Sequence, residues 1–313
     1  MSSTIEKALQ RQREAQKKKA EEAALQASES LSETPPVSDE EVIAVTQPEV
    51  AQDAPASADE LSVPSTLKPF ELDIERLEEN GHISINGVRK QINEEYREIK
   101  RKLINNAFGK LSSTLKNSNI IMVTSGRPSE GKTFTACNLA MSIAAEQDKT
   151  VLLVDADVLK PNVLNTLGLE RREGLMEYLT GEVDDISDVL YPTNLEKLKI
   201  IPAGRSHHLT TELLASEKMA ETVNEFANRY PDRIVIFDTP PLIGITETAI
   251  LANLAGQAVV VVEEGKSKLN DVRHAVERLN PEMAIGFVVN KSVNHDSEGT
   301  GYYGYYYAER QNP

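Results

Sequence analysis

The strongest constraint on the fold of this chain is a phosphate-loop motif, GxxxxGK[ST], at residues 126–133. The motif directly follows a short apolar run, residues 120–123, and opens a helical stretch whose apolar residues share one face. In that context the loop amides point at phosphate oxygens, Lys132 neutralises the β and γ groups, and Thr133 ligates Mg²⁺. The predicted nucleotide site comprises Gly126, Arg127, Pro128, Ser129, Glu130, Gly131, Lys132, Thr133 and Phe134.

Two further apolar runs end in acidic residues. The first leads into Asp155 and Asp157, and the second leads into Asp238. Because parallel strands end at one edge of their sheet, these carboxylates are predicted to lie beside the phosphate loop. A magnesium nucleotide needs hard oxygen ligands there, and an attacking hydroxyl needs a base. We therefore predict catalytic roles for Lys132 and the three aspartates, and metal ligation by Thr133 and the same aspartates, although a single such Asp is equally typical of a cap or turn.

Apolar runs alternate with helical stretches through the rest of the chain. Strands are predicted at 120–123, 151–154, 198–201, 234–237, 258–262 and 285–289. These runs are continuous, as expected for strands covered on both faces. Helices are predicted at 132–146, 174–190, 212–230, 246–254 and 268–279. The alternation predicts an α/β fold with a doubly wound, mostly parallel sheet of the P-loop NTPase type.

The two ends of the chain differ in composition from this central region. Residues 1–26 are rich in charged helix formers and are predicted to be a helical segment, either solvated or docking on a partner. Residues 27–83 are rich in Ser, Pro, Glu and Ala, and we predict a disordered acidic linker because they bury too little apolar surface. A helix predicted at 84–107 opens a domain that reaches residue 291, and residues 292–313 are predicted to be a flexible tail.

Three segments together resemble a known family. GRPSEGKT, VDADVLKP and IFDTPP resemble the Walker A, A′ and B motifs of bacterial tyrosine kinases, the autokinases of exopolysaccharide and capsule systems. The resemblance covers about residues 84–307, and its second motif is the most specific because ordinary P-loop proteins lack it. It implies a non-specific protein-tyrosine kinase with a fold similar to ParA and MinD ATPases, using ATP and Mg²⁺. Either Asp155 or Asp157 would then be the base for a tyrosine hydroxyl.

The sequence also departs from the family pattern. Ser129 stands where the family usually has glycine, Lys160 stands for an arginine, and Glu247 stands for an aspartate. None of these changes removes a phosphate, metal or base group. Ser129 is expected to restrict the loop, because glycine alone reaches positive φ freely.

The C-terminal segment carries a tyrosine cluster made of Tyr302, Tyr303, Tyr305, Tyr306 and Tyr307. By the resemblance this cluster is the autophosphorylation site. The stretch from Lys291 to Tyr307 extends to at most about 55 Å, enough to reach a neighbouring copy. An aromatic strand is the alternative interpretation of the segment.

Glu94, Arg97 and Lys100 lie three residues apart in the predicted helix 84–107. They resemble the family's ExxRxxR oligomerisation motif, with Lys100 in place of the second arginine. The resemblance implies a homo-oligomer whose subunits phosphorylate one another. A solvated charged face is the alternative.

Asn290 and Lys291 end the last predicted strand at the same sheet edge as the phosphate loop. They resemble the adenine-contacting position of this fold, which would add them to the cofactor-binding residues. A strand-end turn is the alternative explanation.

Composition limits the compartment and the partners. A formal net charge of −15 argues against nucleic acid, since duplex binding needs a basic face. The single cysteine, Cys137, excludes an intrachain disulfide and favours a reducing compartment. No apolar run is long enough to span a bilayer and no signal peptide is evident, so we predict a cytoplasmic protein recruited to the inner face of the plasma membrane. The resemblance implies a separate transmembrane activator of the polysaccharide co-polymerase type and a tyrosine phosphatase, and residues 5–9 resemble the start of an exosortase-linked subgroup.

Two other functions compete with a kinase. A ParA- or MinD-like switch ATPase has the same fold, but its signature lysine and two glycines are replaced here by Arg127, Pro128 and Ser129. A scaffold that binds nucleotide only to control assembly is the second alternative. The intact Lys132 and the three aspartates argue against that scaffold.

Overall fold

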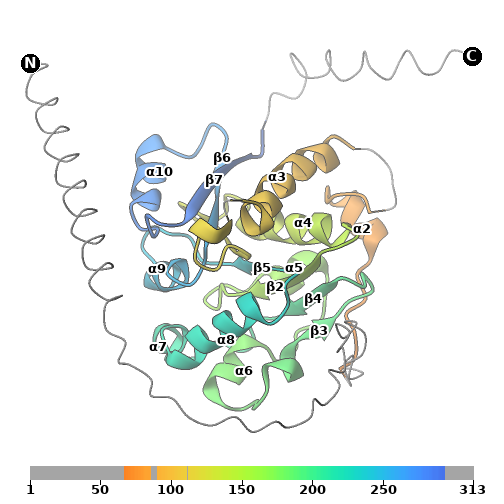
Figure 1. The fold of residues 1–313 in the computed structure, drawn as a ribbon. Coiled ribbons are helices and arrows are strands. Elements are labelled where there is room, and N and C mark those ends of the chain that lie inside the picture. The colour runs from red at the N-terminus through yellow and green to blue at the C-terminus, as the bar shows by residue number, and fades with distance from the viewer. Residues whose placement is uncertain (1–66, 86–89, 111, 293–313) are drawn as a thin grey trace, which may run out of the picture. The chain divides into compact units, whose positions relative to one another are not determined.

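A seven-stranded sheet forms the centre of the protein (Figure 1). The computed structural model describes residues 67–85, 90–110 and 112–292. The strand order is β3-β4-β2-β5-β1-β6-β7, and every neighbouring pair is parallel except β3 with β4. The strands are β1 (Ile120–Ser125), β2 (Thr150–Asp155), β3 (Tyr191–Pro192), β4 (Leu198–Ile201), β5 (Arg233–Asp238), β6 (Gln257–Glu263) and β7 (Ala284–Asn290). The predicted fold class is therefore confirmed.

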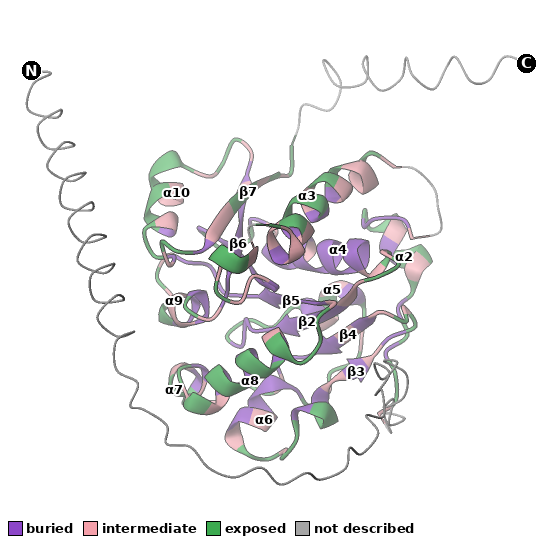
Figure 2. Ribbon diagram, viewed as in Figure 1, coloured by how far each residue is buried: buried purple, intermediate pink, exposed green. Residues whose placement is uncertain are grey.

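Each of the six predicted apolar runs forms a strand. The central strands β1 and β5 are buried along their whole length, which is why residues 120–123 and 234–237 are continuously apolar. Figure 2 shows this burial for β5. The edge strand β7 differs, because Phe287 is 52% exposed and Val289 is 60% exposed. The prediction that all strands are covered on both faces is thus wrong for β7. The two-residue strand β3 was not predicted, since it is too short to produce an apolar run.

Helices lie on both faces of the sheet, with α3 and α4 on one side and α8 and α9 on the other (Figure 1). The helices are α2 (Ile74–Glu79), α3 (Gln91–Phe108), α4 (Lys132–Ala144), α5 (Val163–Leu167), α6 (Leu175–Thr180), α7 (Thr210–Leu214), α8 (Glu217–Asn228), α9 (Thr246–Ala252) and α10 (Leu269–Val276), with 3-10 turns η1 (Ser112–Thr114) and η2 (Ile186–Val189). Two predicted helices are each divided. Gly181, at φ 82°, ends α6 within the predicted helix 174–190. Ser216 starts α8 within the predicted helix 212–230 by accepting a hydrogen bond from the Met219 amide.

Ordered structure begins earlier than the sequence predicts. The segment from residue 67 to 83, assigned above to the linker, forms α2 and packs on the domain core. Phe70 is only 1% exposed, and its amide donates to the Pro192 carbonyl at 2.8 Å. Leu72, Leu77 and Ile83 are also buried. The prediction is wrong for this stretch because a few separated apolar residues are sufficient when a preformed core receives them.

Lys100 does not belong to an outward-facing oligomerisation surface. Its side chain is buried, and its ammonium donates to the Ser142 carbonyl at 2.8 Å and pairs with Glu146 at 2.6 Å. Glu94 and Arg97 instead form an ion pair with each other on the half-exposed side of α3. The three predicted oligomerisation residues therefore do not lie on one exposed surface. Lys100 ties α3 to α4 within its own subunit, whereas Glu94 and Arg97 remain available at the surface.

We expect Lys100→Ala to lower the free energy of unfolding by about 1–3 kcal/mol, because it leaves a buried carbonyl without its charged donor. Urea denaturation followed by circular dichroism measures this change. Lys102→Ala, which removes an exposed lysine two residues away in α3, serves as the control and is expected to change stability by less than about 0.5 kcal/mol. Equal effects of the two substitutions would contradict the anchoring role of Lys100.

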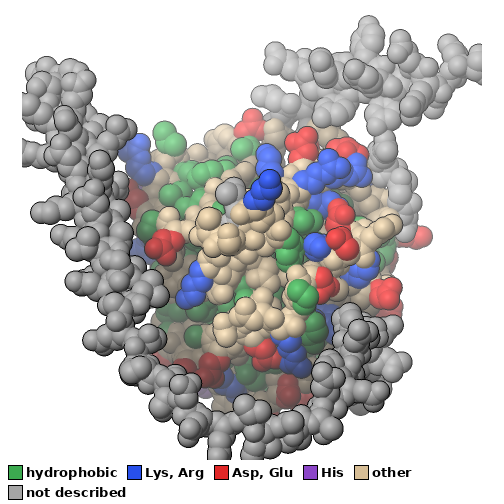
Figure 3. Space-filling model, in the orientation of Figure 1, with side chains coloured by type: hydrophobic (Ala, Val, Ile, Leu, Met, Phe, Trp, Pro, Cys, Tyr) green, Lys and Arg blue, Asp and Glu red, His purple; other side chains and the backbone are tan. Residues whose placement is uncertain are grey.

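Basic and acidic side chains are interspersed on the face drawn in Figure 3, where Lys and Arg lie among Asp and Glu. Among the described residues, no helix combines the length and the apolar character needed to cross a bilayer. The predicted helix at 1–26 and the tyrosine cluster at 302–307 lie outside the described residues.

Candidate functional site

The phosphate loop joins the end of β1 to the start of α4. Gly131 adopts φ 100° immediately before α4, and a Cβ there would lie 1.9 Å from the Asn290 side-chain nitrogen. Glycine is therefore required by both conformation and space. Ser129 also has positive φ, 69°, so a residue with a Cβ occupies a left-handed position where the family usually has glycine. The sequence predicts that Ser129 restricts the backbone of the loop, and in the structure the loop holds Ser129 in this left-handed conformation.

Two side chains of the phosphate loop, Arg127 and Glu130, stabilise it by hydrogen bonds within the loop, to α10 and to the segment before α10. The Arg127 guanidinium donates two hydrogen bonds to Asp271, at 2.6 and 3.0 Å, in a bidentate pair. Glu130 accepts from the Arg127 amide at 2.8 Å and from the Ser267 hydroxyl. Asp271 and Ser267 were not identified from the sequence, because nothing local marks α10 and the segment before it as partners of the phosphate loop.

The end of β7 supports the same loop. Asn290 donates its side-chain amide to the Glu130 carbonyl at 2.9 Å, and the Lys291 ammonium donates to the Ser129 carbonyl at 2.7 Å. Lys291 also pairs with Glu263 at 3.0 Å. These contacts give both residues a structural role at the loop, and adenine contact by them stays a prediction. Phe134, the first helical turn's aromatic residue, packs on the His82 ring at 4.6 Å between centroids, and its predicted contact with nucleotide likewise stays a prediction.

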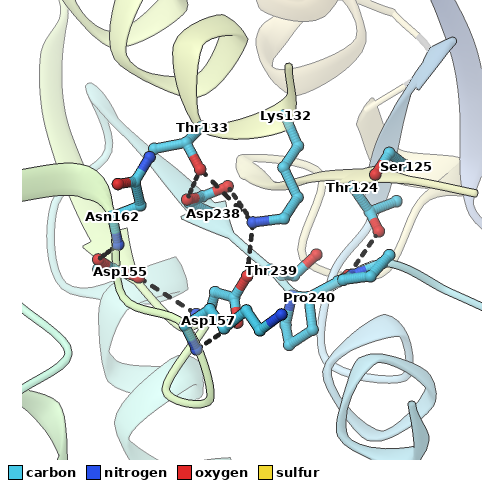
Figure 4. A network of polar contacts seen from close by, with 12 residues as sticks. Thr124, Ser125, Lys132, Thr133, Asp155, Asp157, Asn162, Asp238, Thr239 and Pro240 are labelled. Carbon is cyan, nitrogen blue, oxygen red and sulfur yellow. Dashed lines mark hydrogen bonds and ion pairs between the residues drawn. The ribbon is translucent and has the colours of Figure 1, made fainter. Parts of the chain in front are cut away.

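Lys132, Thr133, Asp157 and Asp238 converge at the carboxyl ends of β1, β2 and β5 (Figure 4). The Lys132 ammonium lies 2.5 Å from an Asp157 oxygen and 3.7 Å from Asp238. The Thr133 hydroxyl donates to Asp238 at 2.6 Å. The sheet register explains this convergence, because Asp155 of β2 lies directly opposite Asp238 of β5. All four side chains are buried or nearly so.

Asp155 lies beside this group but makes different bonds. One of its oxygens accepts from the Asp157 amide at 3.2 Å, and the other accepts from the amides of Asn162 and Val163 at 3.1 and 3.0 Å. Three backbone donors thus use both oxygens and anchor the loop between β2 and α5. Asp157 keeps its carboxylate at the site, with one oxygen on Lys132 and the other accepting from the Lys160 amide.

Burial and charge set the protonation of the cluster. Burial, and secondly the charge of Asp238, raise the pKa of Asp155 well above its usual range. Burial also raises the pKa of Asp238, although the Lys132 charge opposes this effect. Burial acts to lower the pKa of Lys132, but Asp238 and Asp157 outweigh it and raise that pKa. Burial thus disfavours the charged forms of Asp155 and Asp238, and a cation bound beside them would favour those forms.

The residues present fit a magnesium ion shared with a nucleotide. One oxygen of Asp238 has no hydrogen-bond partner although the residue is fully buried, and the other oxygen lies beside the Thr133 hydroxyl. Within residues 67–85, 90–110 and 112–292, no group of three or more His, Cys, Asp or Glu side chains could hold a metal ion. Mg²⁺ commonly binds through one or two carboxylates, with water and phosphate completing its shell. Thr133 and Asp238 satisfy that requirement, while Asp155 has both oxygens committed to the backbone.

Comparisons with known proteins agree with this geometry. Residues 118–284 match the AAA domain family. Tyrosine-protein kinase YwqD of Bacillus subtilis is 34% identical over 214 residues, which span 67% of this chain and 86% of that protein. Tyrosine-protein kinase wzc of Salmonella typhimurium is 32% identical over 195 residues, 62% of this chain but 27% of that protein.

Two solved structures have the same fold. The chimerical protein CapA2B2 superposes with a TM-score of 0.58 at 26% identity, over 66% of this chain and 88% of that chain. The kinase domain of the Escherichia coli tyrosine kinase ETK gives a TM-score of 0.57 at 25% identity, over 69% of this chain and 83% of that chain.

Proposed function

We propose that this chain, which belongs to the bacterial tyrosine-protein kinases within the AAA domain family, transfers the γ-phosphate of ATP to its own C-terminal tyrosines. The acceptors would be the cluster from Tyr302 to Tyr307. The observation that carries the proposal is the contact between the phosphate-loop lysine, Lys132, and the Asp157 carboxylate, with the Thr133 and Asp238 pair beside them. A loop that binds phosphate and a carboxylate that accepts a proton are then within one site.

Each side chain has a distinct role in this proposal. Lys132 exchanges its contact with Asp157 for the β- and γ-phosphates, and Thr133 and Asp238 hold Mg²⁺. When bound there, Mg²⁺ would neutralise charge on the phosphate oxygens. Asp157, released by Lys132, accepts the tyrosine O–H proton, so that the phenol oxygen bonds to the γ-phosphorus as the bond to the β–γ bridging oxygen breaks. Asp155 positions Asp157 through the loop that it anchors.

Phosphate mapping tests the proposal. The full-length protein is incubated with Mg-ATP and phosphorylated tyrosines are located by mass spectrometry. We expect label on Tyr302 to Tyr307 that Lys132→Ala removes, a loss of at least about 100-fold, because the transferring phosphate loses its fixed cation. Lys102→Ala, an exposed lysine remote from the site, is expected to retain the label. ATP hydrolysis with unmodified tyrosines would instead favour a switch ATPase.

We further propose that this activity regulates exopolysaccharide synthesis or export at the cytoplasmic side of the plasma membrane. A separate transmembrane co-polymerase would recruit and activate the protein, and a tyrosine phosphatase would reverse the modification. Self-association would use Glu94 and Arg97, whose pair lies half-exposed on α3. The family resemblance supports these proposals, together with relatives named as tyrosine-protein kinases.

A further inference from the structure

The described part of the chain contains four tyrosines, and they differ in exposure. Tyr96 and Tyr191 are each only 6% exposed. Tyr178 is half-buried in α6, whereas Tyr230 is 38% exposed. Tyr230 lies in the short connection, residues 229–232, between α8 and β5. Of these four side chains, Tyr230 is therefore the one that a second protein can reach.

Two arginines flank the Tyr230 ring. The guanidinium carbon of Arg233 lies 3.7 Å from the ring centroid, and that of Arg229 lies 5.6 Å from it. Arg229 is already paired with Glu225. Arg233 is only 8% exposed, and within residues 67–85, 90–110 and 112–292 it forms no ion pair. The ring attracts the Arg233 guanidinium but does not supply a negatively charged acceptor for its N–H groups.

The strands beside Arg233 carry two more groups that lack partners. Thr150 of β2 lies directly opposite Arg233, and its buried hydroxyl has no hydrogen-bond partner among the described residues. Lys199 lies on β4, the next strand, and in the same part of the chain it forms no ion pair. Burial lowers the pKa of Lys199, and the charge of Arg233 lowers it further. Burial also lowers the pKa of Arg233. An anion bound among these groups would therefore be stabilised.

We infer that Tyr230 is a further phosphorylation site, and that its phosphate binds Arg233 and Lys199. The inference rests on the proposed kinase function. In the transfer, the Tyr230 phenol oxygen bonds to the γ-phosphorus of ATP, the bond to the β–γ bridging oxygen breaks, and ADP leaves. The phenol proton passes to the Asp157 carboxylate of the copy that holds the ATP.

A phosphate on Tyr230 fits these groups in both charge and reach. A phosphotyrosine carries a charge of about −1.5 to −2 at neutral pH and has three strong acceptor oxygens. Because the Arg233 guanidinium already lies over the Tyr230 ring, a shift along the ring brings it against the phosphate oxygens. The phosphate thus supplies the anion that the buried guanidinium lacks, and it links the connection after α8 to β5.

The position of Tyr230 requires transfer between two copies of the chain. Tyr230 precedes the amino end of β5, whereas Asp238 ends that strand beside Lys132. The six residues of β5 span roughly 17 Å. A tyrosine in the short connection at one edge of the sheet cannot reach the phosphate site at the opposite edge of its own subunit. A second copy must therefore supply the ATP and the base.

Phosphate mapping with two distinguishable copies tests the site. The unmodified enzyme is mixed with Mg-ATP and an isotopically labelled Lys132→Ala acceptor copy, and phosphorylated tyrosines of each copy are located by mass spectrometry. We expect phosphate on Tyr230 of the acceptor copy and none on half-buried Tyr178. Phosphate on Tyr302 to Tyr307 without phosphate on Tyr230, or equal phosphate on Tyr178 and Tyr230, would overturn the inference. If no tyrosine of either copy is phosphorylated, the proposed function fails and the inference fails with it.

The rate of dephosphorylation tests the role of the two cations. A broad-specificity tyrosine phosphatase is expected to remove phosphate from Tyr230 at least about tenfold more slowly than from the C-terminal cluster, because ion pairs hold it. Arg233→Met and Lys199→Met each remove one cation and are expected to reduce this protection. The half-buried Lys199 provides this test independently of any effect of Arg233→Met on folding.

Arg101→Met is the matched control, because it removes an exposed arginine of α3. We expect this variant to retain the slow dephosphorylation of Tyr230. Equal rates at Tyr230 and the C-terminal cluster in the unmodified acceptor, or protection that persists in both the Arg233→Met and Lys199→Met proteins, would show that these cations do not bind the phosphate.

Discussion

Asp238→Asn is expected to weaken magnesium-dependent ATP binding and to reduce tyrosine phosphorylation strongly, while raising the melting temperature of the nucleotide-free protein. Asp238 is fully buried, and one of its oxygens lacks a hydrogen-bond partner. A buried carboxylate with so few partners costs folding energy, which the neutral amide avoids. Lys132 keeps its contact with Asp157 in the variant. Removing the carboxylate that faces Thr133 is expected to reduce transfer by about 10³-fold, the scale of a lost electrostatic contact in a catalytic site.

The pH dependence of the melting temperature gives the sign of this effect. Because burial raises the pKa of Asp238, its contribution to stability is fully present below the ordinary Asp pKa near 4 and is lost as pH rises through the raised value. The variant should therefore melt higher than the unmodified protein at pH 8, and the difference should shrink toward pH 4. Each kcal/mol corresponds to about 2–4 °C for a domain of this size.

Scanning calorimetry at several pH values and isothermal titration with Mg-ATP measure the two effects. Asp184→Asn removes an exposed carboxylate and is the control, expected to change neither quantity. A variant that melts lower at pH 8, or that binds Mg-ATP as tightly as the unmodified protein, would contradict the assignment.

Gly174→Ala is expected to lower the free energy of unfolding by about 3 kcal/mol, the upper range for an overpacked position. A Cβ at Gly174 would lie 2.0 Å from the Pro202 carbonyl oxygen and 2.8 Å from the Gly204 amide nitrogen. Both obstacles are backbone. The Leu175 and Met176 amides donate to the carbonyls of Pro202 and Ala203, so the two segments cannot separate without losing these hydrogen bonds.

Chemical denaturation measures the change, and Gly286→Ala is the matched control. Gly286 lies in β7, where an added Cβ would meet no atom closer than 4.0 Å. We expect that control to be neutral or slightly stabilising, because alanine restricts the unfolded chain. Equal stability of the two alanine variants would contradict this prediction, because it would show that the turn after β4 moves to accommodate the added Cβ.

The parts of the fold whose position depends on one local rule are the parts that the sequence predicts correctly. Continuous apolar runs identified the six longer strands. For the inner strands this follows because strands buried on both faces tolerate few polar residues, whereas β7 is apolar although it is partly exposed. The shared carboxyl edge of a parallel sheet then placed Asp157 and Asp238 beside Lys132. The split between Asp155 and Asp157 needed coordinates, since both follow β2 and only their hydrogen-bond partners distinguish them.

The incorrect or missing predictions have a common cause, which is that a local sequence pattern does not specify tertiary contacts. The spacing of Glu94, Arg97 and Lys100 does not specify which side of α3 is buried, and a long lysine stem can cross the boundary to reach Ser142. Residues 67–83 have too few apolar side chains to predict a stable structure alone, yet they pack on a core built by distant segments. The Arg127–Asp271 pair joins residues 144 positions apart, a contact that no local pattern predicts.

The contacts between the end of β7 and the phosphate loop link the proposed nucleotide site to the chain segment that leads to the tyrosines. Asn290 and Lys291 hold loop carbonyls, and the polypeptide continues from them directly toward the tyrosines. If tension, docking or added charge in the segment after Lys291 displaced Asn290 and Lys291, the affinity for nucleotide would therefore change. By thermodynamic reciprocity, nucleotide binding would shift the tail's equilibrium by the same free energy. Under the proposed function, the segment that carries the acceptor tyrosines would thus also affect nucleotide binding in its own subunit.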